Sequence, residues 1–218
     1  MRQQHVEQGE MARLMVEAGV SVPESVLASL SIYLDMLCRW NAVMNLVGHY
    51  SWQKILTDLV LDSFFLAEFL ESLGLPPSPL CWDLGAGAGL PGIPLRMVWT
   101  RGMYSMVEAR EKRALFLSSV IARLQLQGTG VFRGSVENFF RSQACLAECI
   151  LSRAFLPWRQ MLDVVQGHIR PGGILVILSR EPAPRNLPQP WQLLRHMPYT
   201  AGGVQRHFWA LSSEKIVP

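Results

Sequence analysis

The chain has little charge and no long apolar run. Only 17% of its 218 residues are charged and 50% are hydrophobic, which is typical of a globular protein and not of a disordered one. No apolar stretch reaches the roughly 18 residues that a membrane span needs, and the polar opening MRQQHVEQGEM has no apolar signal core behind it. These absences predict a cytoplasmic protein that has no membrane partner.

Cysteine is also scarce. The four cysteines, Cys38, Cys81, Cys145 and Cys149, show no spacing of a disulfide framework. Cys145 and Cys149 are four residues apart without a neighbouring histidine, so a metal site is not indicated. We expect reduced thiols with a structural role and no bound metal.

Lysine is almost missing, because 17 of the 20 basic residues are arginine. The charge is uneven: residues 1–70 carry a net −4, residues 71–149 a net +2 and residues 150–218 a net +5. Arginine forks match phosphate oxygens and stack on bases, so a basic C-terminal half permits a nucleic-acid partner. The alternative is that arginine richness reflects only the composition of the genome.

Residues 1–75 read as helices. Segments 22–41 and 51–74 place apolar residues at helical spacing, with Pro23 in the first turn of one and Gly74 ending the other. From residue 76 onward the pattern changes to short apolar runs that alternate with helical segments. We therefore expect a helical N-terminal segment, residues 1–75, and an α/β domain, residues 76–218.

The second region predicts a mostly parallel, seven-stranded sheet with helices on both faces, a Rossmann-like fold. The expected strands are 80–84, 103–108, 130–134, 148–152, 172–179, 191–200 and 205–214, and the expected helices are 92–99, 110–127, 135–142 and 155–169. Gly202 and Gly203 suit a tight return between the last two strands. That final pair is expected to be antiparallel.

The stretch WDLGAGAGLPGIP, residues 82–94, is the strongest signal of a ligand site. It follows the first strand, where α/β folds bind ligands at the carboxyl ends of the strands. Glycine there lets a ligand approach the backbone. Gly87, Gly89 and Gly92 spell G-x-G-x-x-G, so a nicotinamide dinucleotide is one candidate. Asp83 beside the glycines would repel a pyrophosphate and suits the cationic S-adenosylmethionine, which is the favoured ligand.

Two later strand ends complete the predicted cofactor site. Glu108 ends the second strand, where an acid can accept hydrogen bonds from both ribose hydroxyls; the alternative is a solvated acid paired with Arg110 or Lys112. Val136 and Glu137 follow the third strand, where they can meet adenine. Their alternative is an ordinary helix start capped by Ser135.

Six motifs together resemble one family. NLVGHYSW, LDS, DLGAGAGLPGIPL, VEAREKRALFL, VENF and SRAF occur in the order and spacing of the bacterial 16S ribosomal RNA guanine-7 methyltransferases, also called glucose-inhibited division protein B. The resemblance spans roughly residues 40–180. It implies an S-adenosylmethionine-dependent methyltransferase fold, methyl transfer to nitrogen 7 of a guanine, and 16S ribosomal RNA or the small ribosomal subunit as partner.

The resemblance also assigns site residues. It implies that Gly85, Gly87 and Leu90 contact the methionine end, Glu108 the ribose, and Val136 and Glu137 the adenine, with Arg153 at the methyl-transfer site. Together with Asp83 and Gly89 of the glycine loop, these are the expected cofactor residues. Arg153, in SRAF, is also the implied catalytic residue; its alternative is a structural ion pair with a loop acid. The chain departs from the family pattern at Asp58 with Leu59, at Ser135 and at Ser179 with Arg180, which puts the RNA side of the site in doubt more than the cofactor side.

The implied chemistry agrees with the residues. Nitrogen 7 of guanine carries no proton, so displacement at a sulfonium needs alignment and no general base. Alternatives are a catalytically altered protein or a small-molecule methyltransferase that uses S-adenosylmethionine, and, further off, a nicotinamide-dependent oxidoreductase. We expect a monomer whose acidic N-terminal segment shapes the rim of the pocket.

Overall fold

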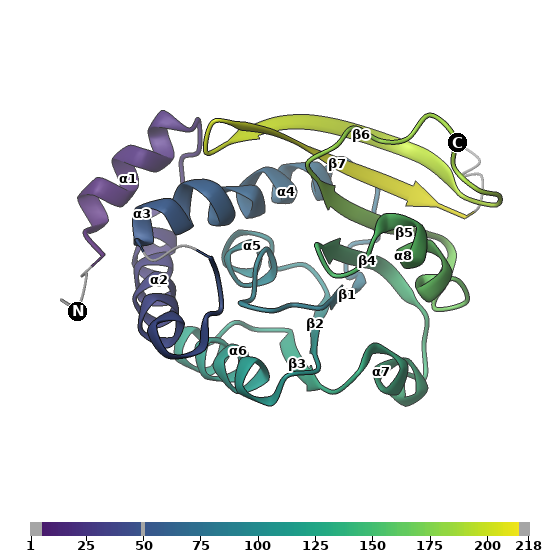
Figure 1. Ribbon diagram of the computed structural model, residues 1–218, viewed down its shortest axis with the longest axis horizontal. Helices are drawn as coiled ribbons and strands as arrows, with labels where there is room; N and C mark the ends of the chain where they lie inside the picture. Colours follow the sequence, from purple (N-terminus) through teal and green to yellow (C-terminus); the bar gives the residue numbers. More distant parts are fainter. Residues whose placement is uncertain (1–5, 49–50, 214–218) are drawn as a thin grey trace.

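The computed structural model describes residues 6–48 and 51–213, which form one seven-stranded sheet with helices on both faces (Figure 1). The strand order is β3-β2-β1-β4-β5-β7-β6. The strands are β1 (Leu80–Leu84), β2 (Met103–Glu108), β3 (Thr129–Arg133), β4 (Ala147–Arg153), β5 (Ile169–Ser179), β6 (Gln192–Ala201) and β7 (Val204–Ser212). The first five are parallel, and β7 is antiparallel to both of its neighbours. This confirms the predicted mostly parallel α/β sheet and its antiparallel final pair.

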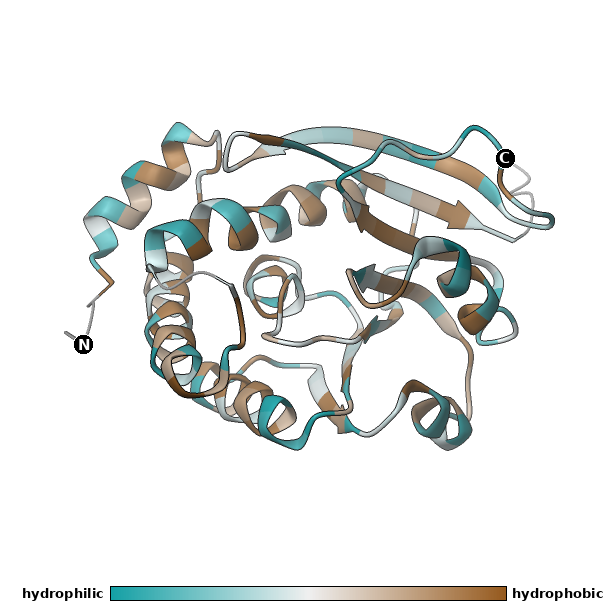
Figure 2. Ribbon diagram, viewed as in Figure 1, coloured by the Kyte–Doolittle hydropathy of each residue, from teal (hydrophilic) through white to brown (hydrophobic). Residues whose placement is uncertain are grey.

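The central strands are apolar on both faces, as expected for a sheet covered on both sides. In β5, Ile174 and Val176 join one core cluster, while Leu175 and Ile177 join the cluster on the opposite face. Figure 2 shows hydrophobic colour along this part of β5. Because successive side chains of β5 point to opposite faces and both faces are covered, every position is apolar and the sequence shows a continuous apolar run here.

Helices divide between the two faces. The first core cluster draws on α1 (Gln8–Glu17), α2 (Glu24–Met44), α3 (Trp52–Ile55), the π-helical turn η1 (Leu56–Val60), α4 (Leu61–Glu71), α5 (Gly92–Val98) and α6 (Glu111–Leu124). The second draws on α7 (Val136–Ser142) and α8 (Trp158–Val165). The N-terminal helices thus share a core with the sheet, and the division at residue 75 stays a prediction.

Three elements differ from the prediction. The helix expected over 51–74 is interrupted by η1, a five-residue π-helical turn, which a period-3.6 pattern does not reveal. The helix expected over 155–169 is shorter, because Ile169 already pairs with Ala147 as part of β5. The described residues also contain α1, a helix that had not been delimited individually within the helical N-terminal region.

Candidate active site at the carboxyl edge of the sheet

The glycine loop leaves β1 where the strand order reverses and is bonded to β2. The N–H groups of Gly85 and Ala86 both donate to the carbonyl of Val107, each at 3.0 Å. The N–H of Gly87 donates to Oε2 of Glu108 at 2.9 Å. The loop is therefore fixed by the neighbouring strand before any ligand arrives.

A helix of the N-terminal segment holds the same loop from the other side. The hydroxyl of Tyr33, on α2, donates to the carbonyl of Ala88 at 2.9 Å, and Tyr33 is completely buried. Leu46, Val47 and Gly48, just after α2, line the cavity above the loop. The N-terminal segment thus supplies part of the pocket wall, as predicted.

The loop glycines are required for different reasons. Gly85, Gly87 and Gly89 all have positive φ, at 75°, 60° and 79°. A Cβ on Gly85 would collide with the ring of Phe155, and a Cβ on Gly89 would lie 2.5 Å from Cδ1 of Ile93. A Cβ on Gly87 would meet no atom closer than the carbonyl oxygen of Gly85 at 3.8 Å. Only at Gly87 does the missing side chain leave open space for a ligand.

Two cavities meet at this edge and share Gly85, Arg113 and Ala154 in their walls. The smaller, about 430 Å³, lies over the ends of β2 and β3 and is lined by Glu108, Val136 and Glu137 among others. The larger, about 610 Å³, runs from the glycine loop toward β5 and β7. Their combined size suits a ligand that bridges two compartments.

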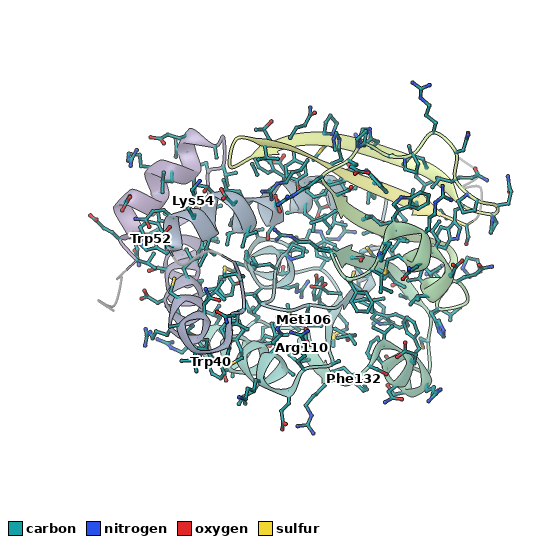
Figure 3. The ribbon with its side chains drawn as sticks, in the orientation of Figure 1. Trp40, Trp52, Lys54, Met106, Arg110 and Phe132 are labelled. Carbon is teal, nitrogen blue, oxygen red and sulfur yellow. The ribbon has the colours of Figure 1, made fainter. Side chains whose placement is uncertain are left out.

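Glu108 is the buried acid of the smaller cavity, only 6% exposed. Its Oε1 accepts the N–H of Arg110 at 2.8 Å, and Figure 3 shows Arg110 near the end of β2, where α6 begins. Glu108 is therefore buried and not solvated. Arg110 binds it through its backbone N–H and not through its guanidinium. Each carboxylate oxygen retains acceptor capacity for a further donor.

Val136 and Glu137 stand at the start of α7, beside Glu108. Ser135 is the N-cap of this helix and accepts the N–H of Asn138 at 3.3 Å. The capping hypothesis is thus confirmed, and it is compatible with a ligand contact. A hydrogen bond with Ser135 lowers the pKa of Glu137.

Cations dominate the larger cavity. Arg113, Arg153, Arg180 and Arg206 line it together with one carboxylate, that of Asp62. Gly85, Gly87 and Leu90 form the side nearest the loop. The arginine side of this cavity therefore favours negatively charged groups.

Asp62, in the LDS motif on α4, is clamped by two arginines. Nη1 of Arg206 donates to both of its oxygens, at 2.7 and 2.6 Å, and Nη2 of Arg153 lies 3.1 Å from Oδ2. Arg153 also donates to the carbonyl of Leu59 at 3.0 Å, within η1. The ion pair expected as the alternative role of Arg153 exists, with a helix acid in place of a loop acid, while Arg153 still faces the cavity.

Tyr199 and Arg206 complete this network. Burial, followed by the charge and hydrogen bond of Asp62, raises the pKa of Tyr199, so Tyr199 is a neutral donor at ordinary pH. Among the described residues, Nε of Arg206 is buried without a hydrogen-bond partner. No local pattern pointed to Arg206, because 144 residues separate it from Asp62.

Two predicted cofactor residues, Asp83 and Gly89, line neither cavity. Asp83 is 1% exposed and its Oδ2 accepts the hydroxyl of Tyr104 at 3.1 Å. Its carboxylate lies under α5, since a Cβ on Gly92 would sit 2.6 Å from it. Burial is the main cause that raises the pKa of Asp83 to about 7. The Asp83 carboxylate therefore faces Tyr104 and the start of α5 and lines neither cavity, which corrects the argument that it faces a cationic ligand.

The departures from the family pattern lie in separate places. Asp58 accepts the hydroxyl of Thr57 at 2.8 Å and packs against the β6–β7 turn, where a Cβ on Gly202 would collide with it. Ser179 lines the larger cavity, and its Oγ accepts the N–H of Glu181 at 2.9 Å. Asp58 thus contacts the β6–β7 turn from η1, away from the cavity lining, whereas Ser179 belongs to the cavity wall.

Residues 6–48 and 51–213 contain no group of three histidine, cysteine or acidic side chains that could hold a metal ion. The four cysteines are free thiols. No helix in the described part is long and apolar enough to cross a membrane.

Comparison with known proteins decides the family. The model of the family described as rRNA small subunit methyltransferase G, or GidB, matches residues 26–189, well over half of the chain. The chain belongs to this family. Ribosomal RNA small subunit methyltransferase G of Nitratidesulfovibrio vulgaris (strain DP4) is 49% identical over 206 residues, which cover 94% of this chain and 94% of that protein. The protein of the same name from Oleidesulfovibrio alaskensis is 45% identical and covers 96% and 95%.

Solved structures agree on the fold. A crystal structure of a mutant of MtNAS superimposes with a TM-score of 0.58 at 13% identity, over 94% of this chain and 81% of that chain. At this identity the likeness concerns the fold alone. Membership of the rRNA small subunit methyltransferase G family confirms the resemblance found in the sequence and makes this chain a methyltransferase, so the oxidoreductase alternative is set aside.

Proposed function

We propose that the chain binds S-adenosylmethionine and transfers its methyl group to nitrogen 7 of a guanine in 16S ribosomal RNA, releasing S-adenosylhomocysteine. The pair of joined cavities carries this proposal. One cavity holds a buried carboxylate at the end of β2, and the other extends past the bare backbone of Gly87 into a space lined by arginines. The names of the similar proteins support the substrate class.

The residues present fit the cofactor. S-adenosylmethionine would supply a methyl group on a positively charged sulfur. Glu108 would accept two ribose hydroxyls with the lone pairs that Gly87 and Arg110 leave free. Val136 would pack on the adenine and Glu137 would meet its edge. The open space at Gly87 leaves room for the methionine end.

The guanine would enter from the arginine side. Nitrogen 7 has a free lone pair, so the protein's task is to align it and to stabilise charge. Arg153 lines the cavity and is held by Asp62 and Leu59, so its remaining N–H groups can bind the guanine oxygen or a phosphate. Both oxygens of Asp62 already accept hydrogen bonds from an arginine. This acid is therefore committed to holding the arginines, which suits a reaction that removes no proton from nitrogen 7.

Methyl transfer in vitro tests this proposal. Small ribosomal subunits from a host that lacks the gene, and the naked 16S ribosomal RNA from them, are incubated with labelled S-adenosylmethionine. The wild type should place one methyl group per RNA, recovered as 7-methylguanosine after digestion, and Gly87→Trp should place none. The two substrates also show whether free RNA or the subunit is used. Label in another nucleoside, or no transfer to either substrate, would overturn the proposal.

A further inference from the structure

The larger cavity has a wall that the cofactor does not account for. The cofactor would occupy the smaller cavity and the loop side of the larger one. The wall beyond it is formed by β5, β7 and the start of α8, with Ile177, Ser179, Trp158 and Trp209 among its residues. Two tryptophans in the wall of an arginine-rich cavity suggest a ligand that has both a flat apolar part and negative charge.

Trp158 is the accessible tryptophan of this pair. It is the first residue of α8 and is partly exposed, whereas Trp209 on β7 is 1% exposed. Their rings meet edge to face, with centroids 6.2 Å apart and an interplanar angle of 78°. The indole N–H of Trp209 donates to the carbonyl of Glu181 at 3.1 Å. The buried Trp209 ring thus packs against Trp158 and limits the movement of its indole in the cavity wall.

Positive charge lies against this ring. The guanidinium of Arg159 lies over one face of Trp158, with its carbon 4.4 Å from the ring centroid, and Arg180 lines the same cavity. Among the described residues, neither arginine has an ion-pair partner. Cations beside an exposed aromatic ring are the combination with which proteins bind single-stranded nucleic acid, because bases stack on the ring and phosphates meet the charge.

We propose that Trp158 is the stacking platform for an unstacked base of the RNA substrate, and that Arg159 binds an adjacent phosphate. This inference rests on the proposed function. An enzyme that modifies a base must take it out of the helical stack or find it unstacked, and an aromatic side chain compensates for the lost stacking. Trp158 lines the cavity that contains Arg153 and the glycine loop, so a base held there is close to the transfer site.

The test compares three variants with the wild type in methyl transfer to subunits from the deletion host. Trp158→Leu removes the aromatic face, and Trp158→Phe keeps a flat ring. Trp40→Leu is the matched control, because Trp40 is also partly exposed and packs on an aromatic ring, that of Phe116, at 5.6 Å. Figure 3 shows Trp40 on the α2 side of the molecule, away from α8.

Trp158→Leu should raise the KM for the subunit roughly 5- to 150-fold, the range that corresponds to loss of one base–aromatic stack. Its affinity for S-adenosylhomocysteine should not change. Trp158→Phe and Trp40→Leu should stay close to the wild type. An unchanged KM in Trp158→Leu, equal losses in Trp158→Leu and Trp158→Phe, or a parallel loss of S-adenosylhomocysteine affinity would each overturn the inference. A wild type that transfers no methyl group would instead refute the proposed function.

Salt separates the two parts of the proposal. Arg159→Gln should reduce the slope of log affinity against log salt by about 0.7, the value for one phosphate contact on a single strand. Trp158→Leu should weaken binding and leave that slope unchanged, since stacking releases no counterion. An unchanged slope in Arg159→Gln would refute the phosphate contact.

Discussion

Alanine at Gly85 should mainly lower the stability of the fold and alanine at Gly87 should mainly weaken cofactor binding, although the two glycines lie two residues apart in one loop. Both have positive φ, so each alanine costs about 1–2 kcal/mol of folding free energy for its left-handed backbone. The Gly85 methyl group also collides with the ring of Phe155, and overpacking adds about 1–3 kcal/mol. Gly85→Ala should therefore lose roughly 2–5 kcal/mol of stability, and Gly87→Ala only the first part.

Cofactor binding should show the reverse order. The Gly87 methyl group meets no protein atom closer than 3.8 Å and projects into the space proposed for the ligand. Gly87→Ala should therefore bind S-adenosylhomocysteine weakly while remaining folded, and Gly87→Trp should not bind it. Urea denaturation measures the free energy of unfolding, and calorimetry measures the dissociation constant at a temperature where both variants are folded.

The double variant Gly85→Ala with Phe155→Ala serves as the control for the collision. Removing the ring should recover part of the stability lost in Gly85→Ala, so the two changes should be non-additive, as expected for residues in contact. Wild-type affinity in Gly87→Ala, with loss of affinity in a folded Gly85→Ala, would show that the ligand does not run past Gly87.

Three further variants test the supports of the site. Burial raises the pKa of Asp83 from 3.8 to about 7, so the free energy of unfolding should fall as pH rises between these values and then level off. Asp83→Asn should remove this contribution and raise the free energy of unfolding by about 4 kcal/mol at pH 8. Urea denaturation across pH measures both. Glu108→Ala should weaken S-adenosylhomocysteine binding by about 1.5–3 kcal/mol, and an unchanged dissociation constant would remove Glu108 from the site. Arg153→Ala should lower kcat more than cofactor affinity, and equal losses in kinetics and calorimetry would make it a cofactor residue.

Local patterns were sufficient to predict most of the fold. The strand runs of residues 80–84 and 103–108 coincide with β1 and β2, because short apolar runs next to glycine-rich loops mark strand ends. The antiparallel final pair followed from Gly202 and Gly203. By contrast, the π-helical turn at 56–60 depends on tertiary context, since the carbonyl of Leu59 bonds to a side chain from β4.

The sequence points to candidate site residues that lie near the loop in the order of elements, and it does not reveal those that distant strands contribute. Glu108 ends β2 and Val136 follows β3, so the order of elements places them at the same edge of the sheet. Arg206 comes from β7 and is brought to Asp62 only by the antiparallel hairpin. Asp83 was misplaced because alternation along a strand fixes which residues share a face, but not which face contacts the ligand.

The nucleoside composition of 16S ribosomal RNA from the host, with and without the gene, tests the central claim most directly. After deletion and complete digestion, mass spectrometry should show one 7-methylguanosine missing from the RNA. The wild-type gene should restore it, and the gene carrying Gly87→Trp should not. Survival of every 7-methylguanosine after deletion would contradict the account and assign the methyl group to another substrate.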